Sequence, residues 1–179
     1  MASALIPSDI FTGDPILIES QGTIKPCPAN VTVKCAGVFQ GIQFVNASGE
    51  QKFARSFTGG TTATDVKVHI ASDPAQTYFV QADSTLSDGE IGIVNSYTAT
   101  VSAADAGSRI TGQSNYRLVG APVGVAVEIG AHARVVGRKD IDGDSINGNV
   151  TDTDQYPIVE VFLSGHRNNF VKAQVSTSV

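Results

Sequence analysis

The chain has 179 residues, of which 41% are hydrophobic and only 16% are charged, and its net charge is −5. This length suits one domain and is sufficient to bury a substantial apolar core. The 12 Lys and Arg residues are scattered without a basic block, and no apolar run approaches the ~18 residues of a membrane span, so we expect neither nucleic acid nor membrane as a partner.

The first 30 residues contain four prolines, which cannot donate hydrogen bonds to a strand ladder: Pro7, Pro15, Pro26 and Pro28. We therefore predict an extended Pro-rich arm over residues 1–30, in which PILIES can form one short strand. A single β-rich domain over residues 31–179 is expected to follow. The opening MASALIPSDIF lacks the basic and long apolar segments of a signal peptide, so no such leader is expected.

Short apolar runs separated by turn residues fill the rest of the chain. GIQFV and QKFARSF flank the turn NASGE, which predicts a hairpin over residues 41–57. Residues 65–71 alternate strictly, with Val66, Val68 and Ile70 on one face and Lys67 and His69 on the other. Further runs are TYFVQAD, IGIVNSYTATV, VGVAVEIG, ARVVGR and PIVEVFLSGH.

This spacing predicts an all-β fold, an antiparallel β-sandwich or β-barrel of about ten short strands with the N-terminal arm attached. The pattern does not decide between sandwich and barrel.

The chain contains two cysteines, Cys27 and Cys35, with PCPANVTVKC around them. Two reduced thiols are the favoured interpretation, and a disulfide closing a small loop is the alternative in an oxidising compartment. The absence of a neighbouring histidine in the sequence argues against a zinc site.

An acidic loop late in the chain is the sharpest local motif. Asp140, Asp142 and Asp144 alternate around Gly143, and carboxylates at this spacing can converge on a calcium ion. The pattern departs from an EF-hand loop, because the glycine comes too early and Thr151 stands where a glutamate is needed. A solvated loop between two strands is the favoured interpretation, and a calcium site is the alternative.

No catalytic or cofactor-binding residue is predicted. The histidines His69, His132 and His166 are far apart in sequence, and neither a nucleophile elbow nor a phosphate-binding glycine loop occurs. A glycosidase pair would have to come from Glu90, Glu128 and Glu160, in a chain without tryptophan. We therefore expect a protein that is not an enzyme.

Several features, in their order along the chain, resemble the capsid decoration (cement) proteins of tailed bacteriophages, over roughly residues 35–168. They are the run SDPAQTYFVQAD at Ser72–Asp83, TGQS at Thr111–Ser114, an asparagine in the late loop and a histidine that closes the last long strand.

The resemblance implies a β-rich virion protein without catalytic residues or a cofactor. Such proteins are made in the bacterial host cytoplasm, bind the outside of an icosahedral capsid, often as trimers or dimers, and bridge subunits of the major capsid protein. The Pro-rich arm would then lie ordered over a neighbouring subunit. The alternative function is a carbohydrate- or cell-surface-binding β-module of an adhesin or tail fibre, and a small β-barrel enzyme is the third.

Overall fold

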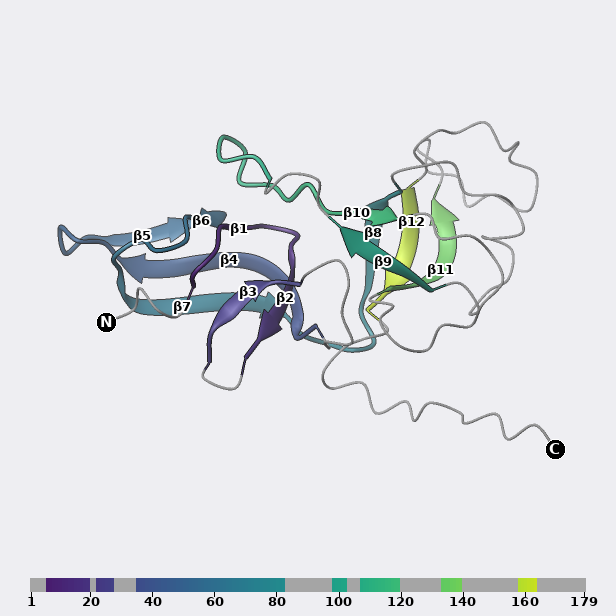
Figure 1. Ribbon diagram of the computed structural model, residues 1–179, viewed down its shortest axis with the longest axis horizontal. Coiled ribbons are helices and arrows are strands. Elements are labelled where there is room, and N and C mark those ends of the chain that lie inside the picture. Colours follow the sequence, from purple (N-terminus) through teal and green to yellow (C-terminus); the bar gives the residue numbers. More distant parts are fainter. Residues whose placement is uncertain are drawn as a thin grey trace.

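The computed structural model in Figure 1 describes residues 6–19, 22–27, 35–82, 98–102, 107–119, 133–139 and 158–163. These residues form twelve strands and no helix, which confirms the predicted all-β class, and every ladder between two of these strands is antiparallel. Within the same residues there is no helix of the length and hydropathy that a membrane span requires.

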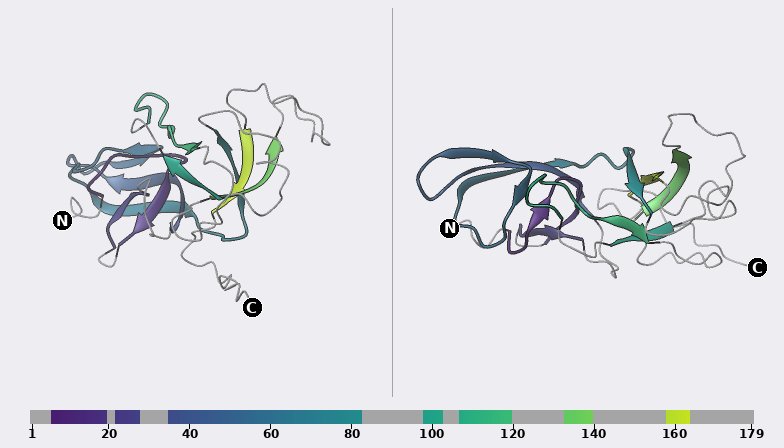
Figure 2. Two further views of the ribbon diagram at one scale, coloured as in Figure 1. Left: turned by 45° about the vertical axis from the view of Figure 1, so that its right-hand side comes forward. Right: turned by 90° about the horizontal axis from the view of Figure 1, so that it is seen from above.

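Seven strands lie before residue 72: β1 (Ile10–Phe11), β2 (Pro15–Ile18), β3 (Ile24–Pro26), β4 (Gly37–Val45), β5 (Gln51–Ala54), β6 (Ser56–Phe57) and β7 (Thr64–Ala71). Five strands follow: β8 (Thr77–Gln81), β9 (Thr98–Ser102), β10 (Arg117–Val119), β11 (Ala133–Lys139) and β12 (Ile158–Phe162). The two groups form separate bodies that lie end to end (Figures 1 and 2).

The first sheet is built around β4, which pairs with β2, β5 and β7, while β3 extends the sheet from β2. The predicted hairpin is confirmed, because Gln43 pairs with Phe53 and Val45 with Gln51. The predicted alternation of β7 is also confirmed: its three apolar side chains pack on the core, whereas Lys67 and His69 are exposed.

One apolar core lies beneath this sheet and is completed by the N-terminal segment. Ile6, Ile10 and Ile16 are each at most 2% exposed and pack with Phe39 and Ile42 of β4. The short strand β1 pairs with β6 over this core. Residues 6–18 therefore supply one wall of the core.

This placement differs from the arm expected over residues 1–30, because the described residues 6–19 and 22–27 are integrated into the fold. The prolines are tolerated by position: Pro15 is the first residue of β2, and Pro26 ends the edge strand β3. At such positions the missing N–H removes little of the ladder. Residues 1–5 and 28–30 lie outside the described part, and a single domain over residues 31–179 stays a prediction.

The second sheet has the strand order β10-β9-β11-β12-β8. An isolated parallel bridge between Ala82 and Leu118 joins its two ends, so the sheet closes on itself. Ala82, Leu118, Val159 and Val161 are nearly or completely buried inside it.

Cys27 and Cys35 are joined in a disulfide, with their Cα atoms 6.3 Å apart, so the favoured interpretation of two reduced thiols was wrong. Both cysteines are buried with Leu17 and Val38 of the first sheet. Leu163, which follows β12, and Tyr78 of β8 complete this cluster. The disulfide therefore lies in a small apolar cluster that joins the two bodies.

Candidate functional site

The residues predicted from sequence as sites fall mostly outside the described part. Asp140, Asp142 and Asp144 all lie there, so the calcium site stays a prediction. Of the histidines and glutamates considered for catalysis, only His69 on β7 and Glu160 on β12 are described, and they belong to different sheets. Among the described residues, no group of three or more His, Cys, Asp or Glu is placed to hold a metal ion.

The outer face of the first sheet carries an exposed aromatic side chain. Gln43 pairs with Phe53 on one side and with Lys67 on the other, so these three residues form one row across β5, β4 and β7. Directly paired residues share a face, and Phe53 is 74% exposed. We call these three residues the outer row. It combines one aromatic ring with an amide and an ammonium group.

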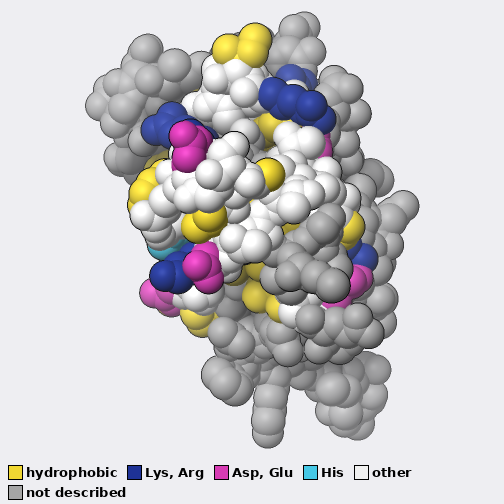
Figure 3. All heavy atoms as spheres, turned by 90° about the vertical axis from the view of Figure 1, so that its left-hand side faces the viewer, with side chains coloured by type: hydrophobic (Ala, Val, Ile, Leu, Met, Phe, Trp, Pro, Cys, Tyr) yellow, Lys and Arg dark blue, Asp and Glu magenta, His cyan; other side chains and the backbone are white. Residues whose placement is uncertain are grey.

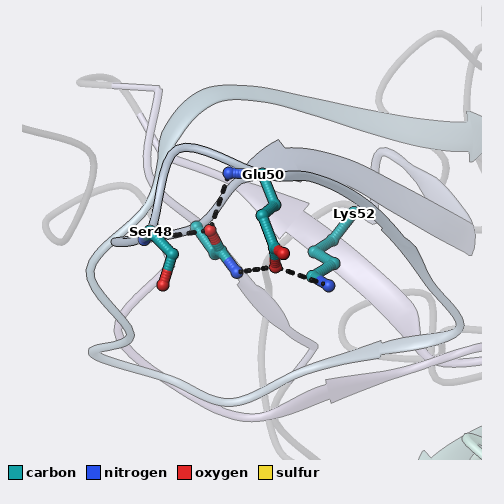
Figure 4. A network of polar contacts seen from close by, with 4 residues as sticks. Ser48, Glu50 and Lys52 are labelled. Carbon is teal, nitrogen blue, oxygen red and sulfur yellow. Dashed lines mark hydrogen bonds and ion pairs between the residues drawn. The ribbon is translucent and has the colours of Figure 1, made fainter.

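The hairpin that carries Phe53 has a tightly bonded tip (Figure 4). The Asn46 Oδ1 atom accepts hydrogen bonds from the N–H groups of Ser48 (3.0 Å) and Glu50 (2.9 Å). Lys52 lies 2.8 Å from the Glu50 carboxylate, and this contact, together with a hydrogen bond from Asn46, lowers the pKa of Glu50. Because the tip is fixed by short-range bonds, Phe53 is presented on a pre-ordered hairpin.

A second exposed aromatic lies on the other body. Phe79 of β8 pairs with Glu160 of β12 and is 57% exposed. On the first body, whose end faces the viewer in Figure 3, hydrophobic side chains are interspersed with both signs of charge. Aromatic side chains in such polar surroundings are enriched in protein–protein interfaces.

Residues 107–116, which we call the clasp, connect the two bodies. The clasp leads into β10 of the second sheet and extends towards β1 (Figure 1). The Thr12 N–H donates to the Gly112 carbonyl, and the Ser114 N–H donates back to the Thr12 carbonyl, both at 2.9 Å. The Tyr116 hydroxyl donates to the Cys27 carbonyl at 2.5 Å.

An ion pair adds to the backbone contacts of the clasp. The Arg109 guanidinium contacts Asp9, which also accepts a hydrogen bond from the Gly59 N–H at 2.9 Å. Partial burial raises the pKa of Asp9, but the Gly59 N–H and Arg109 lower it by more, so the net shift is downward. The clasp is thus held at both of its ends.

A buried carboxyl group lies beneath the clasp. Asp14 is 2% exposed, and its Oδ2 atom accepts a hydrogen bond from the Phe11 N–H at 2.8 Å. Its Oδ1 atom has no hydrogen-bond partner among the described residues. Burial raises the pKa of Asp14, although hydrogen bonds from Ser114 and Phe11 oppose the increase.

Comparison of the chain with protein-family models, curated proteins and solved structures finds no match. The functional argument therefore depends on the residues themselves. Sequence reasoning missed both Asp14 and the role of the clasp. Within the clasp, TGQS at Thr111–Ser114 is part of the resemblance to decoration proteins, but nothing in this motif predicts a contact with residues 9–14.

Proposed function

We propose that the chain is a non-enzymatic virion structural protein that binds the outside of an icosahedral phage capsid. It would stabilise the shell by bridging subunits of the major capsid protein. The observation that carries the proposal is the presence of an exposed aromatic side chain on each of two joined bodies, Phe53 on the first sheet and Phe79 on the second. A bridging protein needs two contact surfaces, and the clasp fixes their relative positions.

The physical advantage of such a bridge is avidity. A ligand that binds only the expanded shell stabilises that state by mass action. When one surface has bound, the second binds at a high effective concentration, provided that the two surfaces are held in a compatible geometry. The bridging role belongs here to the two sheets, since β1, β2 and β3, which lie within the crosslinking arm expected over residues 1–30, already pair within their own chain.

The test is co-sedimentation with expanded tailed-phage capsids that lack outer proteins, with unexpanded shells as the comparison. We expect saturable binding to expanded shells alone. The variants Phe53→Ser and Phe79→Ser should each weaken binding by at least about tenfold, as for interface anchors. Ile110→Ser is the matched control, because Ile110 is 98% exposed but belongs to the clasp tip. Equal binding to both shells, or none to either, would contradict the proposal.

The second candidate is a carbohydrate- or cell-surface-binding module, and the outer row favours it. An exposed ring beside the polar groups of Gln43 and Lys67 has the mixed chemistry of many ligand sites. A glycan array separates the two functions. Glycan binding that is lost in Phe53→Ser, in a protein that ignores expanded capsids, would replace the first proposal with the second.

A further inference from the structure

Asp14 is unusual in its surroundings. Among the residues whose burial the structure describes, it is the one charged or polar residue that is buried to this degree, and its Oδ1 atom lacks a partner. A buried carboxylate without a cation is costly, because neither water nor a counter-charge stabilises it. Of the three ion pairs found in the described residues, none includes Asp14.

The groups that face Asp14 do not supply a positive charge. From its own turn comes the Phe11 N–H, and from the clasp come Ser114 and Tyr116. Burial, followed by the nearby Asp14 charge, raises the pKa of Tyr116 to about 12, so this phenol remains neutral. The Arg109 guanidinium of the clasp pairs with Asp9, which lies in the segment before β1.

We propose that Asp14 is a proton-dependent latch between the two bodies: the clasp closes over its protonated carboxyl group and loosens when that group ionises. This inference does not depend on the proposed capsid binding.

The clasp is the side from which water can reach Asp14. On the other side, the Phe39 N–H donates to the Asp14 carbonyl at 2.9 Å, and the turn leads directly into the core strand β2. Opening there would disrupt Phe39 and Ile16, which are fully buried. Opening of the clasp leaves the strands of the first sheet paired. It breaks two backbone hydrogen bonds to Thr12, the Tyr116 and Ser114 hydrogen bonds, the Asp9–Arg109 ion pair and the packing of Gly107 on Phe11.

The sign of the pH dependence follows from the direction of the shift. The pKa of Asp14 is raised above its ordinary value of 3.8, so its contribution to clasp closure is complete below that pH. The contribution is lost as the pH rises through the pKa of the closed state. Asp9 has the opposite behaviour: its pKa is lowered, so the Asp9–Arg109 contribution is lost only as the pH falls below 3.8. The two effects therefore occur in separate pH ranges.

The test is amide hydrogen exchange of residues 107–116 between about pH 4 and about pH 8, corrected for intrinsic rates. In the wild type, protection of residues 107–116 should fall as the pH rises. The fall should be roughly tenfold for each unit by which the pKa of Asp14 in the closed state exceeds its pKa in the open state. In Asp14→Asn, protection should be independent of pH. Tyr116→Phe, which lacks the bond to Cys27, should have lower protection but keep the pH dependence.

The same pH dependence in wild type and Asp14→Asn would overturn the proposal. If Asp14→Asn does not fold, the wild type still decides by carbon NMR of the Asp14 carboxyl group. A midpoint above 3.8 that coincides with the loss of clasp protection supports the latch. A midpoint below 3.8, or protection that does not follow the titration, rejects it.

Discussion

At the residue scale, burial separates two isoleucines of identical chemistry. Ile10 is 0% exposed in the core of the first sheet, and Ile110 is 98% exposed at the clasp tip. Removing a buried side chain loses its transfer free energy and leaves a cavity. Ile10→Ala should therefore lower the free energy of unfolding by about 2–5 kcal/mol.

Urea denaturation measures this difference. Ile110→Ala is the matched control and should change the free energy of unfolding by no more than about 0.5 kcal/mol. Equal effects of the two substitutions would show that the N-terminal segment does not pack on the core in solution.

A second residue-scale prediction concerns Gly107, which has a φ of +98°. A Cβ atom there would lie 2.7 Å from the Phe11 ring and 2.8 Å from the Gln113 carbonyl oxygen. Gly49 also has a positive φ, +81°, but open space around it. Both Gly→Ala variants carry backbone strain of about 1–2 kcal/mol, and Gly107→Ala should cost about 1–3 kcal/mol more through overpacking. Thermal denaturation of both variants checks the difference, and similar midpoints would contradict the docking of the clasp on Phe11.

At the element scale, β1 and β2 are needed by the first sheet, because Ile10 and Ile16 supply part of the apolar core beneath it. A chain that lacks residues 2–18 should lose cooperative unfolding of this sheet. Deletion of residues 2–5 alone leaves both strands and Ile6 in place and serves as the control. Near-ultraviolet circular dichroism and hydrogen exchange of β4 report the result. Native-like protection of β4 in the longer deletion would show that these strands are an accessory arm, which is what the proline content of residues 1–30 predicts.

The disulfide constrains the connection between β3 and β4. Its cysteines are 8 positions apart, and closing a loop of this size removes unfolded-state entropy worth about 2–3 kcal/mol. Reduction should lower the free energy of unfolding by this amount, as measured by urea denaturation with and without a phosphine reductant. A double variant, Cys27→Ala with Cys35→Ala, should respond to urea identically in both buffers. If the reductant did not change the free energy of unfolding of the wild type, the thiols would already be reduced in solution.

The elements that sequence predicted correctly are those whose pattern is local. The period of two in β7 and the turn residues of the 41–57 hairpin define strands without any knowledge of distant contacts. The strands at residues 10–18 are harder to predict, because the number of prolines in a segment does not tell where each proline lies in a sheet. Asp14 resembled an ordinary turn residue between Gly13 and Pro15. Its burial depends on the clasp, about a hundred residues later in the chain, and no local pattern encodes that contact.

At the scale of the whole molecule, the chain passes between the two bodies through the turn at Ser72–Gln76, so their coupling depends on non-covalent contacts. These contacts are the clasp and the apolar cluster that includes Tyr78 and Leu163. With both in place, we expect the two bodies to unfold in one transition. Replacing residues 108–113 by a short Gly-Ser link removes the bonds from Gly112 and Arg109, and should divide unfolding into two transitions, as expected for weakly coupled units.

Calorimetry distinguishes these cases, because a single transition requires equal calorimetric and van't Hoff enthalpies. The control is a similar shortening of the hairpin tip between Asn46 and Glu50, which is far from the clasp and should leave one transition at a lower temperature. A clasp-shortened protein that still unfolds in one step would mean that the Tyr78–Leu163 cluster, with the remaining hydrogen bonds of Ser114 and Tyr116, is sufficient to couple the bodies. In that case, Leu163→Ala in the shortened chain should separate them, because Leu163 is the buried residue that the second body contributes to the cluster.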